Sequence, residues 1–367
     1  SQRPTRVLQV VLSLHPGGTE RLVVETVRRL APEFPMAICC LDAAGAWGDQ
    51  LRAEGVPVAV TGRGEGFHPG LGHAVARVAA QHRATVLHAH HYSPFVYAAI
   101  SRLWNPRRHV VYTEHGRLSD APPSAKRRLA NALFARLPHA VYAVSADLRR
   151  HIVEEGFPAE RVGVIYNGID LGILPTPADR ASVRAELGVH PDALVVGTIA
   201  RLDPVKDLPT MIEAVARLRR STPALLLVIG DGAERSALER AAAAAGAQET
   251  VRFLGHREDA RRWLAGCDVY ANSSIHEGVS LTILEAMSAG LPVVASRVGG
   301  TPEIVPEEVG RLVAPRDPGA LAAALAALAA DGPQRQQLGR AARRHVEERF
   351  TIERMVREYR DVYLRVA

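Results

Sequence analysis

The stretch DVYANSSIHEGVSLTILEAMSAGLPVVAS, residues 268–296, holds one complete structural unit. Its apolar run at 268–273 is followed by a polar loop, by a helical pattern that ends at Gly290, and by a second apolar run at 291–296. Short β-branched runs on either side of a helical pattern are typical of strand–helix–strand units around a parallel sheet. The stretch therefore predicts an α/β fold.

The same alternation of strands and helices occurs twice along the chain. In the first half the strand-sized runs extend from RVLQVVLS (6–13) to VGVIYN (162–167), and in the second half from ALVVGTIA (193–200) to GRLVA (310–314). A chain of 367 residues is longer than one hydrophobic core usually supports, which also favours two domains. We expect ligands to bind in a cleft between these domains.

The stretch GIDLGILPTPADR (168–180) lies between the two sets of strands and is rich in glycine and proline. Such a composition, without helical or strand periodicity, is typical of a linker. We place the boundary near residue 175, which gives domains 1–175 and 176–367 with 168–180 as the natural hinge. The last segment, 351–367, has helical apolar spacing and is able to pack back against the first domain.

The net charge of +6 suits an anionic ligand, an acidic membrane surface or nucleic acid. Arginines are spread over both halves and no recognised nucleic-acid motif occurs, so we expect no nucleic-acid partner. Of the 45 basic residues, only Lys126 and Lys206 are lysine. A lysine in so arginine-rich a chain indicates that position 206 needs this particular side chain.

The longest apolar runs are strand-sized, well short of the ~18 residues that a membrane span requires. With no signal-peptide pattern and three cysteines, including the adjacent Cys39 and Cys40, we expect a reducing, cytoplasmic location. The stretch 124–142 mixes basic residues with Leu129 and Phe134. It suits either peripheral contact with an anionic membrane on its inner face or an ordinary surface helix packed on the sheet.

A first candidate site is HPGGTE (15–20), which follows the first strand and begins a helix. Gly17 and Gly18 allow a ligand to approach the backbone at a helix N-terminus. Their spacing differs from the dinucleotide fingerprint G-x-G-x-x-G, which disfavours a dehydrogenase. The alternative is a tight turn in which Glu20 complements the helix dipole.

A second candidate site lies just beyond the strand 193–200, where α/β sheets bind ligands. Arg201 offers a forked guanidinium and Lys206 a compact ammonium, and together these groups suit a diphosphate. The alternative is a pair of solvated loop charges. The scarcity of lysine favours the diphosphate.

A third candidate site surrounds the helix inside 268–296. Glu277 precedes this helix and Glu285 follows eight residues later, about 2.2 turns on, so the two carboxylates fall on neighbouring faces. We expect an uncapped helix N-terminus at residues 278–280, where the backbone amides of Val279 and Ser280 face a phosphate. The apolar residues after Glu285 indicate an interior position.

Five motifs, in this order and at these spacings, resemble the retaining glycosyltransferases of family 4, which have the GT-B fold. They are GGTE (17–20), NGID (167–170), ARLDPVKD (200–207), GDG (230–232) and the E-x7-E pair Glu277 and Glu285. The resemblance covers essentially the whole chain, and E-x7-E together with R-L-x-P-x-K is its specific part. It implies two Rossmann-like domains facing across a cleft, with the donor held mainly by the second and the acceptor mainly by the first.

The resemblance implies roles for the charged residues. Arg201 and Lys206 would neutralise the diphosphate of the donor, Glu285 would bind the ribose hydroxyls of its nucleotide, and Glu277 would face its sugar. Gly18 would let the diphosphate lie close to the backbone.

The remaining carried-over positions concern the sugar and the base. His115, in TEHG (113–116), matches the position that approaches the transferred sugar and the acceptor. Gly232 and the strand end from Leu254 to His256 would border the base.

The expected reaction is transfer of a hexose or N-acetylhexosamine from a nucleoside diphosphate to an acceptor hydroxyl, with retention by front-face attack as the resemblance implies. UDP is favoured over GDP and ADP on family frequency alone. The acceptor is a carbohydrate, a lipid-linked sugar or a small molecule, bound by the loops 62–70 and 115–125. The alternatives are a nucleotide-sugar 2-epimerase and an inactive donor-binding scaffold.

Four histidines near the ends of the fourth and fifth predicted strands allow another interpretation. His88, His90, His91 and His115 could form a zinc cluster, but no acidic or cysteine partner accompanies them in the sequence pattern. The chain also lacks a D-x-D motif for a metal-bridged diphosphate. We therefore expect no metal and no other cofactor, with cationic side chains in the place of the metal.

Overall fold

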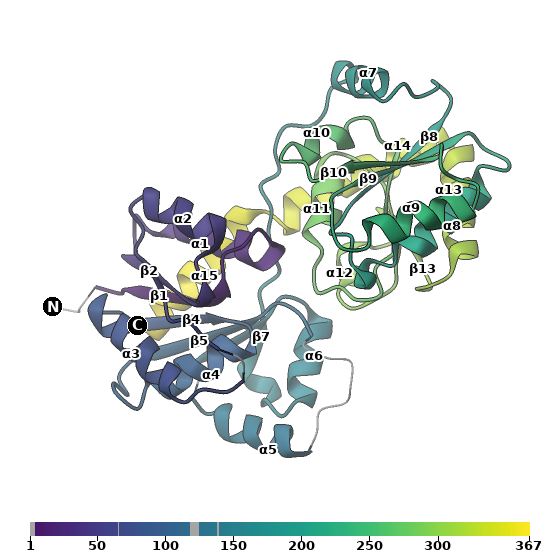
Figure 1. Ribbon diagram of the computed structural model, residues 1–367. Helices are drawn as coiled ribbons and strands as arrows, with labels where there is room; N and C mark the ends of the chain where they lie inside the picture. The colour runs from purple at the N-terminus through teal and green to yellow at the C-terminus, as the bar shows by residue number, and fades with distance from the viewer. Residues whose placement is uncertain (1–3, 65, 118–124, 138) are drawn as a thin grey trace. The chain divides into compact units, whose positions relative to one another are not determined.

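The computed structural model describes residues 4–64, 66–117, 125–137 and 139–367, which form two compact units (Figure 1). The first unit comprises Ser1–Gly168 and Ile352–Ala367, and the second comprises Ile169–Thr351. The division falls after Gly168 rather than near residue 175. Most of the predicted acceptor loop 115–125 lies outside the described residues.

Contacts of the linker explain where the division falls. The Ile169 N–H donates to the Phe350 carbonyl at 2.9 Å, and Arg261 donates to the carbonyls of Asp170 and Leu171 at 2.8 and 2.7 Å. These bonds attach the first linker residues to the second unit. The expected hinge 168–180 is therefore anchored over part of its length.

In the first unit, the strands of the described residues form a seven-stranded parallel sheet of order β3-β2-β1-β4-β5-β6-β7. They are β1 (Val7–Ser13), β2 (Met36–Ala43), β3 (Val58–Val60), β4 (Val86–His90), β5 (His109–Glu114), β6 (Ala140–Ala143) and β7 (Val162–Val164). The central β1 and β4 are largely buried, as their continuous apolar runs predict.

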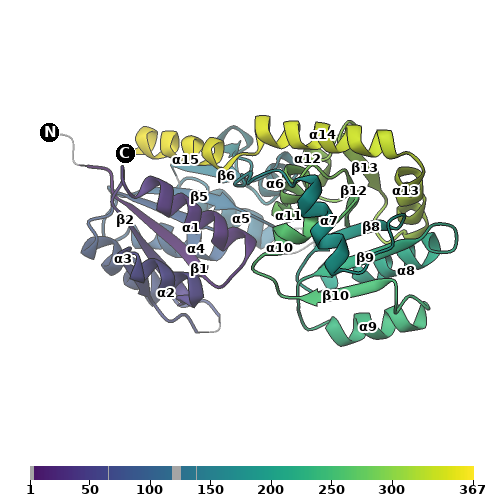
Figure 2. The ribbon, with the colours of Figure 1, turned by 90° about the horizontal axis from the view of Figure 1, so that it is seen from above.

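The helices of the first unit cover this sheet. They are α1 (Gly18–Leu30), α2 (Gly45–Ala53), α3 (Gly70–Gln81), α4 (Tyr92–Ser101), α5 (Ala125–Phe134), α6 (Ala146–Glu154), the short 3₁₀ helix η1 (Ala159–Arg161) and α15 (Ile352–Val366). The last helix, α15, packs against α1 of this unit (Figure 2). Its apolar stripe, which includes Tyr359 and Tyr363, is buried there.

The second unit contains a six-stranded parallel sheet of order β10-β9-β8-β11-β12-β13. Its strands are β8 (Leu194–Ile199), β9 (Ala224–Ile229), β10 (Val251–Gly255), β11 (Val269–Asn272), β12 (Val293–Ser296) and β13 (Gly310–Val313). Its helices are α7 (Pro177–Glu186), η2 (Pro204–Lys206), α8 (Leu208–Leu218), α9 (Arg235–Ala244), α10 (Ala260–Leu264), α11 (Leu281–Ser288), α12 (Thr301–Ile304), α13 (Pro318–Ala330) and α14 (Gly332–Arg349). The expected α/β fold is thereby confirmed in both units.

Each sheet reverses its strand order once, between β1 and β4 in the first unit and between β8 and β11 in the second. Ligands of doubly wound folds bind beyond the carboxyl ends of the strands at this reversal. The segments that follow these four strands begin at Leu14, His91, Ala200 and Ser273. The predicted site residues Gly18, Arg201, Lys206 and Glu277 lie in or directly after these segments.

Cys39, Cys40 and Cys267 are buried thiols without a disulfide. Burial raises the pKa of each thiol to about 12, so none of the three ionises near neutral pH. All three are therefore uncharged residues of the hydrophobic core.

Within the described part of the chain, no helix is both long enough and apolar enough to span a membrane. Of the expected interfacial segment 124–142, residues 124 and 138 lie outside the described residues, and α5 forms its helical part. Leu129 of α5 is exposed and Phe134 is half-buried. Contact of this segment with a membrane stays a prediction.

Candidate functional site

Arg201 lies immediately beyond β8 on a loop with a fixed backbone. The Leu202 N–H donates to the Asp231 carbonyl at 3.0 Å, and the Glu234 N–H donates to the Leu202 carbonyl at 3.0 Å. The Arg201 side chain is 78% exposed and pairs with Asp203 at 3.2 Å. The loop thus holds the backbone in place while the guanidinium stays accessible to an anionic ligand.

The glycines of GDG are required by this loop. A Cβ on Gly230, whose φ is +137°, would lie 1.9 Å from the Ala200 carbonyl oxygen, and one on Gly232 would lie 2.5 Å from that of Leu202. The Gly230 N–H also donates to the Gly255 carbonyl at 2.8 Å, which brings the end of β10 beside the same turn. There Leu254 is half-buried and His256 is exposed. The predicted role of Gly232, Leu254 and His256 beside a base stays a prediction.

Lys206 and Glu277 form an ion pair, although the predictions place Lys206 at the diphosphate and Glu277 at the sugar of the donor. Lys206 Nζ lies 2.8 Å from Glu277 Oε1, and the two side chains are 21% and 10% exposed. Lys206 ends η2, and its backbone carbonyl accepts a hydrogen bond from Ser273 Oγ at 2.8 Å. An ammonium has three N–H donors, of which Glu277 takes one.

Glu277 is oriented by further donors. Its Oε1 accepts hydrogen bonds from Ser274 Oγ at 2.7 Å and from Asn272 Nδ2 at 3.3 Å. A Cβ on Gly299, whose φ is +49°, would lie 1.9 Å from the Glu277 carbonyl oxygen. A left-handed glycine therefore permits the close approach of the chain that supports Glu277. Asn272, Ser274 and Gly299 were not predicted from the sequence.

The N-terminus of α11 is capped, which corrects the expectation of an uncapped helix at residues 278–280. Ser280 is the N-cap residue, and its side chain accepts a hydrogen bond from the Ile283 N–H at 3.5 Å. Serine is among the preferred N-cap residues because its hydroxyl satisfies one of the orphan amides of the first turn. Val279 and Ser280 are both buried. The end of the helix dipole remains beside Glu277 and favours an anion there.

Glu285 lies within α11 and is 5% exposed, as its apolar surroundings predict. A carboxylate in such a position normally has hydrogen-bonding partners, because an uncompensated buried charge is costly. Tyr270, which sequence reasoning missed, connects the elements around it. Its hydroxyl lies 2.8 Å from Thr282 Oγ1 on α11 and accepts from the Ile199 N–H at 3.2 Å. The ends of β8 and α11 are thereby joined.

In the first unit, the glycine turn supports the alternative prediction for Glu20. Gly17 is the N-cap of α1, and Glu20 lies in the first helical turn with its carboxylate folded back over Gly17. Gly18, the first residue of α1, is exposed. The turn therefore places an accessible backbone at a helix N-terminus, and the predicted contact of Gly18 with a diphosphate stays a prediction.

Three of the histidines near the β4 and β5 ends belong to a hydrogen-bonded network. His90 Nδ1 lies 2.9 Å from His115 Nε2, and His90 Nε2 lies 2.8 Å from Gln9 Oε1. His88 Nδ1 lies 2.7 Å from the Tyr363 hydroxyl. Both ring nitrogens of His90 are thus engaged by protein groups. Within the described residues, no group of three or more His, Cys, Asp or Glu side chains is placed to hold a metal.

Burial keeps these imidazoles neutral. It lowers the pKa of His88 to about 3, and together with repulsion from neighbouring histidines it holds the pKa values of His90 and His115 well below the usual range. Neutral imidazoles act as one donor and one acceptor each. His115 therefore has hydrogen-bonding capacity without charge.

His91 differs from these three. Its Nδ1 lies 2.7 Å from Glu114 Oε1. Burial lowers the pKa of His91, but the hydrogen bond and the charge of Glu114, with a contribution from Glu20, raise it above the usual value. His91 also has a φ of +73°, a conformation that is strained for a residue with a side chain. The pair was not predicted, since neither the strain nor the register of β4 and β5 is visible in the sequence.

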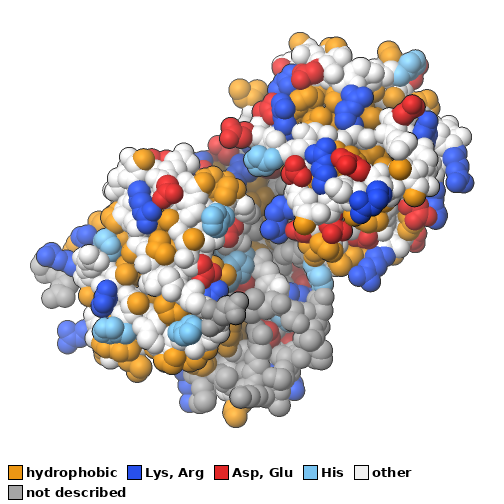
Figure 3. All heavy atoms as spheres, in the orientation of Figure 1, with side chains coloured by type: hydrophobic (Ala, Val, Ile, Leu, Met, Phe, Trp, Pro, Cys, Tyr) orange, Lys and Arg blue, Asp and Glu red, His pale blue; other side chains and the backbone are white. Residues whose placement is uncertain are grey.

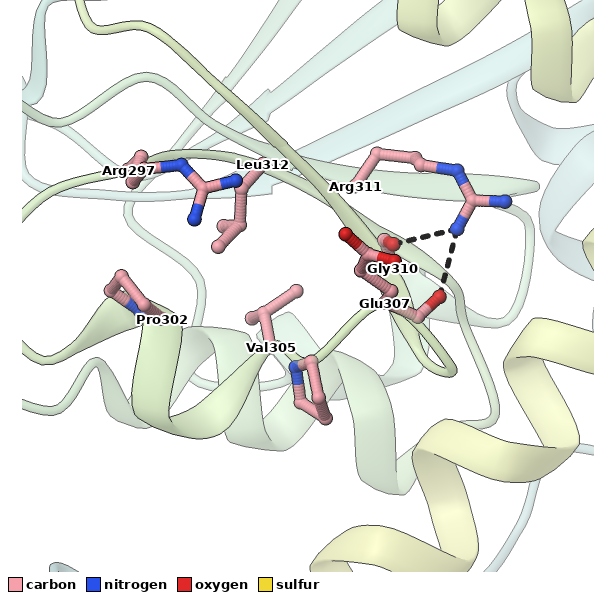
Figure 4. Close-up of a pocket in the computed structure, with 8 residues that line it drawn as sticks. Arg297, Pro302, Val305, Glu307, Gly310, Arg311 and Leu312 are labelled. Carbon is pink, nitrogen blue, oxygen red and sulfur yellow. Dashed lines mark hydrogen bonds between the residues drawn. The ribbon is translucent and has the colours of Figure 1, made fainter.

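A cavity of about 510 Å³ lies at the β13 edge of the second unit (Figure 4). It is lined by residues of α12, β13 and their connection, with Arg297 opposite Pro302. Arg311 turns to the carbonyls of Glu307 and Gly310 at 2.8 Å, so protein groups already satisfy part of its charge. The cavity is lined by residues other than the predicted site residues, and we assign it no role.

The described basic residues do not gather in one patch on the face that Figure 3 draws. On the face drawn in Figure 3, the coloured Lys and Arg side chains are interspersed with Asp and Glu over both units. Nucleic-acid binding calls for a basic patch or stripe. Among the described residues on this face, no such patch or stripe is visible.

Two family models match the chain. The model described as "Glycosyltransferase Family 4" matches residues 16–172, and the one described as "Glycosyl transferases group 1" matches residues 179–345. Between them they include every motif on which the sequence-based assignment depends.

Two curated relatives extend this similarity over most of the chain. The D-inositol 3-phosphate glycosyltransferase of Geodermatophilus obscurus is 33% identical over 308 residues, 77% of this chain and 67% of that protein. The N-acetyl-alpha-D-glucosaminyl L-malate synthase of Bacillus anthracis is 27% identical over 299 residues, 80% of this chain and 78% of that protein.

A solved structure is similar over nearly the whole length. Anabaena HepE in complex with UDP has a TM-score of 0.87 and 27% identity, covering 98% of this chain and 99% of that chain. The same protein in complex with UDP-glucose has a TM-score of 0.85, covering 97% and 98%.

Proposed function

The chain belongs to glycosyltransferase family 4 and has the GT-B fold, and on this premise we propose that it transfers a hexose or N-acetylhexosamine from a UDP-sugar to an acceptor hydroxyl. The observation that carries the proposal is the Lys206–Glu277 pair, which lies beside the N-terminus of α11 and the Arg201 loop. Cations, a helix dipole and a carboxylate converge there at the carboxyl ends of β8 and β11.

Lys206 would change partners when the donor binds. The β-phosphate competes with Glu277 for the ammonium, and Glu277 becomes available to accept a hydrogen bond from a sugar hydroxyl. As the C1–O bond breaks, negative charge grows on the β-phosphate, and donors fixed in advance stabilise that charge preferentially. Lys206, Arg201 and the amides at Val279 and Ser280 would supply these donors. Glu285 would bind the ribose.

The choice of UDP rests on the relatives. HepE was solved with UDP and with UDP-glucose, and it is 27% identical to this chain. The same proposal places the base of the nucleotide beside Gly232, Leu254 and His256. Neither GDP nor ADP has comparable support among these relatives.

Transfer would proceed without a metal ion. Lys206 and Arg201 carry the positive charge that a divalent cation supplies in metal-dependent transferases. Retention of the anomeric configuration by front-face attack, with the leaving phosphate helping to remove the acceptor proton, comes from family membership. Removal of divalent ions with a chelator should leave the rate unchanged.

The acceptor would be bound mainly by the first unit. The exposed Gly18 turn, the loop 62–70 and His115 follow the carboxyl ends of its strands. The relatives are named as a D-inositol 3-phosphate glycosyltransferase and an N-acetyl-alpha-D-glucosaminyl L-malate synthase. Small molecules that carry hydroxyl groups together with a phosphate or a carboxylate are therefore the first acceptors to try, before carbohydrates and lipid-linked sugars. The reaction would take place in the cytoplasm, with peripheral membrane contact through 124–142 as a separate possibility to test with vesicles.

A panel of UDP-, GDP- and ADP-sugars in a thermal-shift assay tests the donor, because at equal concentrations the ligand that binds the folded state with the lowest Kd stabilises it most. A UDP-sugar should give the largest shift, and release of UDP should then require an acceptor. Epimerised sugar formed without an acceptor would indicate the 2-epimerase instead. Donor binding without turnover by any acceptor would favour the inactive scaffold.

A further inference from the structure

One continuous chain of hydrogen bonds joins His115 to the last helix of the protein. In order, its members are His115, His90, Gln9, Tyr363, His88 and Thr113, and we call it the imidazole relay. Successive links measure 2.9, 2.8, 3.0, 2.7 and 2.9 Å. All six residues belong to the first unit, and apart from the partly exposed His115 all are buried.

The relay has only two self-consistent arrangements of its protons. Each neutral imidazole donates through one nitrogen and accepts through the other, and the Gln9 side chain donates through Nε2 and accepts through Oε1. With Gln9 Nε2 donating to the Tyr363 hydroxyl and Oε1 accepting from His90 Nε2, His90 Nδ1 must accept from His115 Nε2. Reversal of the Gln9 amide reverses every link.

The arrangement of protons in the relay decides whether His115 Nδ1 carries a proton. In the arrangement above, Nε2 carries the proton and Nδ1 has a lone pair. In the reversed arrangement Nδ1 carries the proton. This atom is buried and lacks a hydrogen-bond partner in the described part of the chain. A buried polar atom without a partner calls for an explanation, and a ligand group that completes the chain provides one.

We propose that Tyr363 is a positioning residue for His115: through Gln9 and His90 it fixes His115 in the tautomer whose Nδ1 accepts a hydrogen bond from a hydroxyl of the bound sugar or acceptor. The proposal rests on the proposed function for the nature of that ligand, but the tautomer itself is a property of the protein alone. The Tyr363 hydroxyl both accepts from Gln9 and donates to His88, so the orientation of the Gln9 amide is tied to the rest of the relay. The structure has the first of the two arrangements, in which Gln9 Nε2 donates to this hydroxyl and Oε1 faces His90 Nε2. Without the hydroxyl, either amide orientation leaves one Gln9 atom unsatisfied, so the preference for the first arrangement is lost.

Tyr359 provides a matched comparison on the same helix. It is buried to a similar degree, with 2% exposure against 0% for Tyr363. Its hydroxyl lies 3.5 Å from Thr113 Oγ1, beyond the far end of the relay. A Tyr359→Phe variant therefore loses a buried hydroxyl from α15 without touching Gln9.

The test is the protonation state of the histidine ring nitrogens, measured by long-range ¹H–¹⁵N NMR on the full chain without nucleotide. A His115→Asn variant assigns the His115 resonances. The wild type and Tyr359→Phe should each show a single His115 tautomer with the proton on Nε2, whereas Tyr363→Phe should show both tautomers. Gln9→Met, which breaks the relay one link closer to His115, should reproduce the Tyr363→Phe spectrum and covers the case in which Tyr363→Phe fails to fold.

A kinetic measurement accompanies the spectra. With an active donor and acceptor, Tyr363→Phe should lower kcat by about tenfold, the cost of one misplaced hydrogen bond, without weakening UDP binding. A single unchanged His115 tautomer in both Tyr363→Phe and Gln9→Met would overturn the proposal. If no acceptor supports transfer by the wild type, the proposed function fails, but the spectra still decide the role of Tyr363.

Discussion

The two units hold their candidate residues by different physical means. In the second unit the candidate residues are charged: Lys206 forms an ion pair with Glu277, and Arg201 is exposed to solvent. In the first unit His88, His90 and His115 are neutral imidazoles linked to one another through hydrogen bonds. Under the proposed function, this difference would be a division of labour in which fixed charge serves an anionic diphosphate and neutral donors and acceptors serve a hydroxyl.

His91 and Glu114 are the exception in the first unit. They form a hydrogen-bonded pair beside the neutral network, in which Glu114 raises the pKa of His91, and Glu114 Oε1 also accepts from the His115 backbone N–H at 3.0 Å. The pair thus holds the backbone of His115 while the imidazole relay holds its ring. Charge in this unit acts on the position of the chain, and charge in the second unit would act on the ligand.

Substitution of Lys206 tests the contrast between the charged and the neutral candidate site most strongly. Replacement by alanine removes a donor to the developing phosphate charge and leaves Glu277 without its cation, so kcat should fall by roughly 100- to 1000-fold. Arg217→Ala, which removes an exposed cation of α8 that pairs with Glu213 at the preceding turn, is the control and should leave the rate unchanged. Steady-state kinetics with a UDP-sugar gives the answer. Turnover by Lys206→Ala at the wild-type rate would contradict the proposed role of Lys206 at the diphosphate.

Glu285 should show a smaller effect that is confined to nucleotide binding. Glu285→Gln weakens hydrogen bonds to the ribose hydroxyls that a charged acceptor would make, and about 10- to 100-fold weaker binding of UDP is expected. Isothermal titration with UDP and with the 2′-deoxy analogue separates the ribose contacts from the phosphate contacts. The variant should lose more affinity for UDP than for the 2′-deoxy analogue, and an equal loss for both ligands would contradict a contact between Glu285 and the ribose 2′-hydroxyl.

Acid should destabilise the first unit before the second. The buried imidazoles of His88, His90 and His115 have lowered pKa values, so their contribution to stability is full above about 6.5 and is lost as pH falls below it. The loss is on the order of 1 kcal/mol per group for each pH unit. His91 acts in the opposite sense, because its raised pKa favours the folded state until pH rises through that value.

Hydrogen exchange at a series of pH values, corrected for intrinsic rates, measures this difference. Between pH 7 and pH 5, amides of β4 and α15 should lose more protection than amides of β8 and β11. Equal losses in the two units would contradict the assignment of neutral histidines to the first unit.

Arg201 should have the smallest effect. Its side chain is 78% exposed, so its attraction to a phosphate is screened by water and salt. Arg201→Ala should weaken UDP binding by less than about tenfold at low ionic strength, and the difference from the wild type should shrink as salt is added. An effect as large as that of Lys206→Ala would mean that the guanidinium becomes enclosed when the ligand binds.

The fold, and the placement of the candidate residues at the carboxyl ends of strands, were accessible to sequence reasoning because both follow from local patterns. Strand–helix alternation predicts the parallel sheets, and the placement of Arg201 and Lys206 after β8 follows from the motif that contains them. Contacts between distant segments were not accessible. Gln9 and Tyr363 are separated by 354 positions, and nothing in either local pattern indicates that they meet.

Two further features of the second unit, a helix cap and an ion pair, were not predicted, for different reasons. The capping of α11 by Ser280 was predictable from the sequence, because serine is among the preferred N-cap residues. The Lys206–Glu277 pair could not have been read, because the approach of η2 to the loop after β11 depends on the register of β8 and β11. The sequence-based prediction placed these two residues on separate parts of the ligand and therefore did not include their contact with each other.

The most direct test of the division of labour is isothermal titration of UDP into Lys206→Ala and His115→Asn, alongside their rates of transfer. The account predicts that Lys206→Ala loses UDP affinity as well as transfer, whereas His115→Asn loses transfer and binds UDP as tightly as the wild type. UDP binding that is weakened equally by the two substitutions would contradict the account.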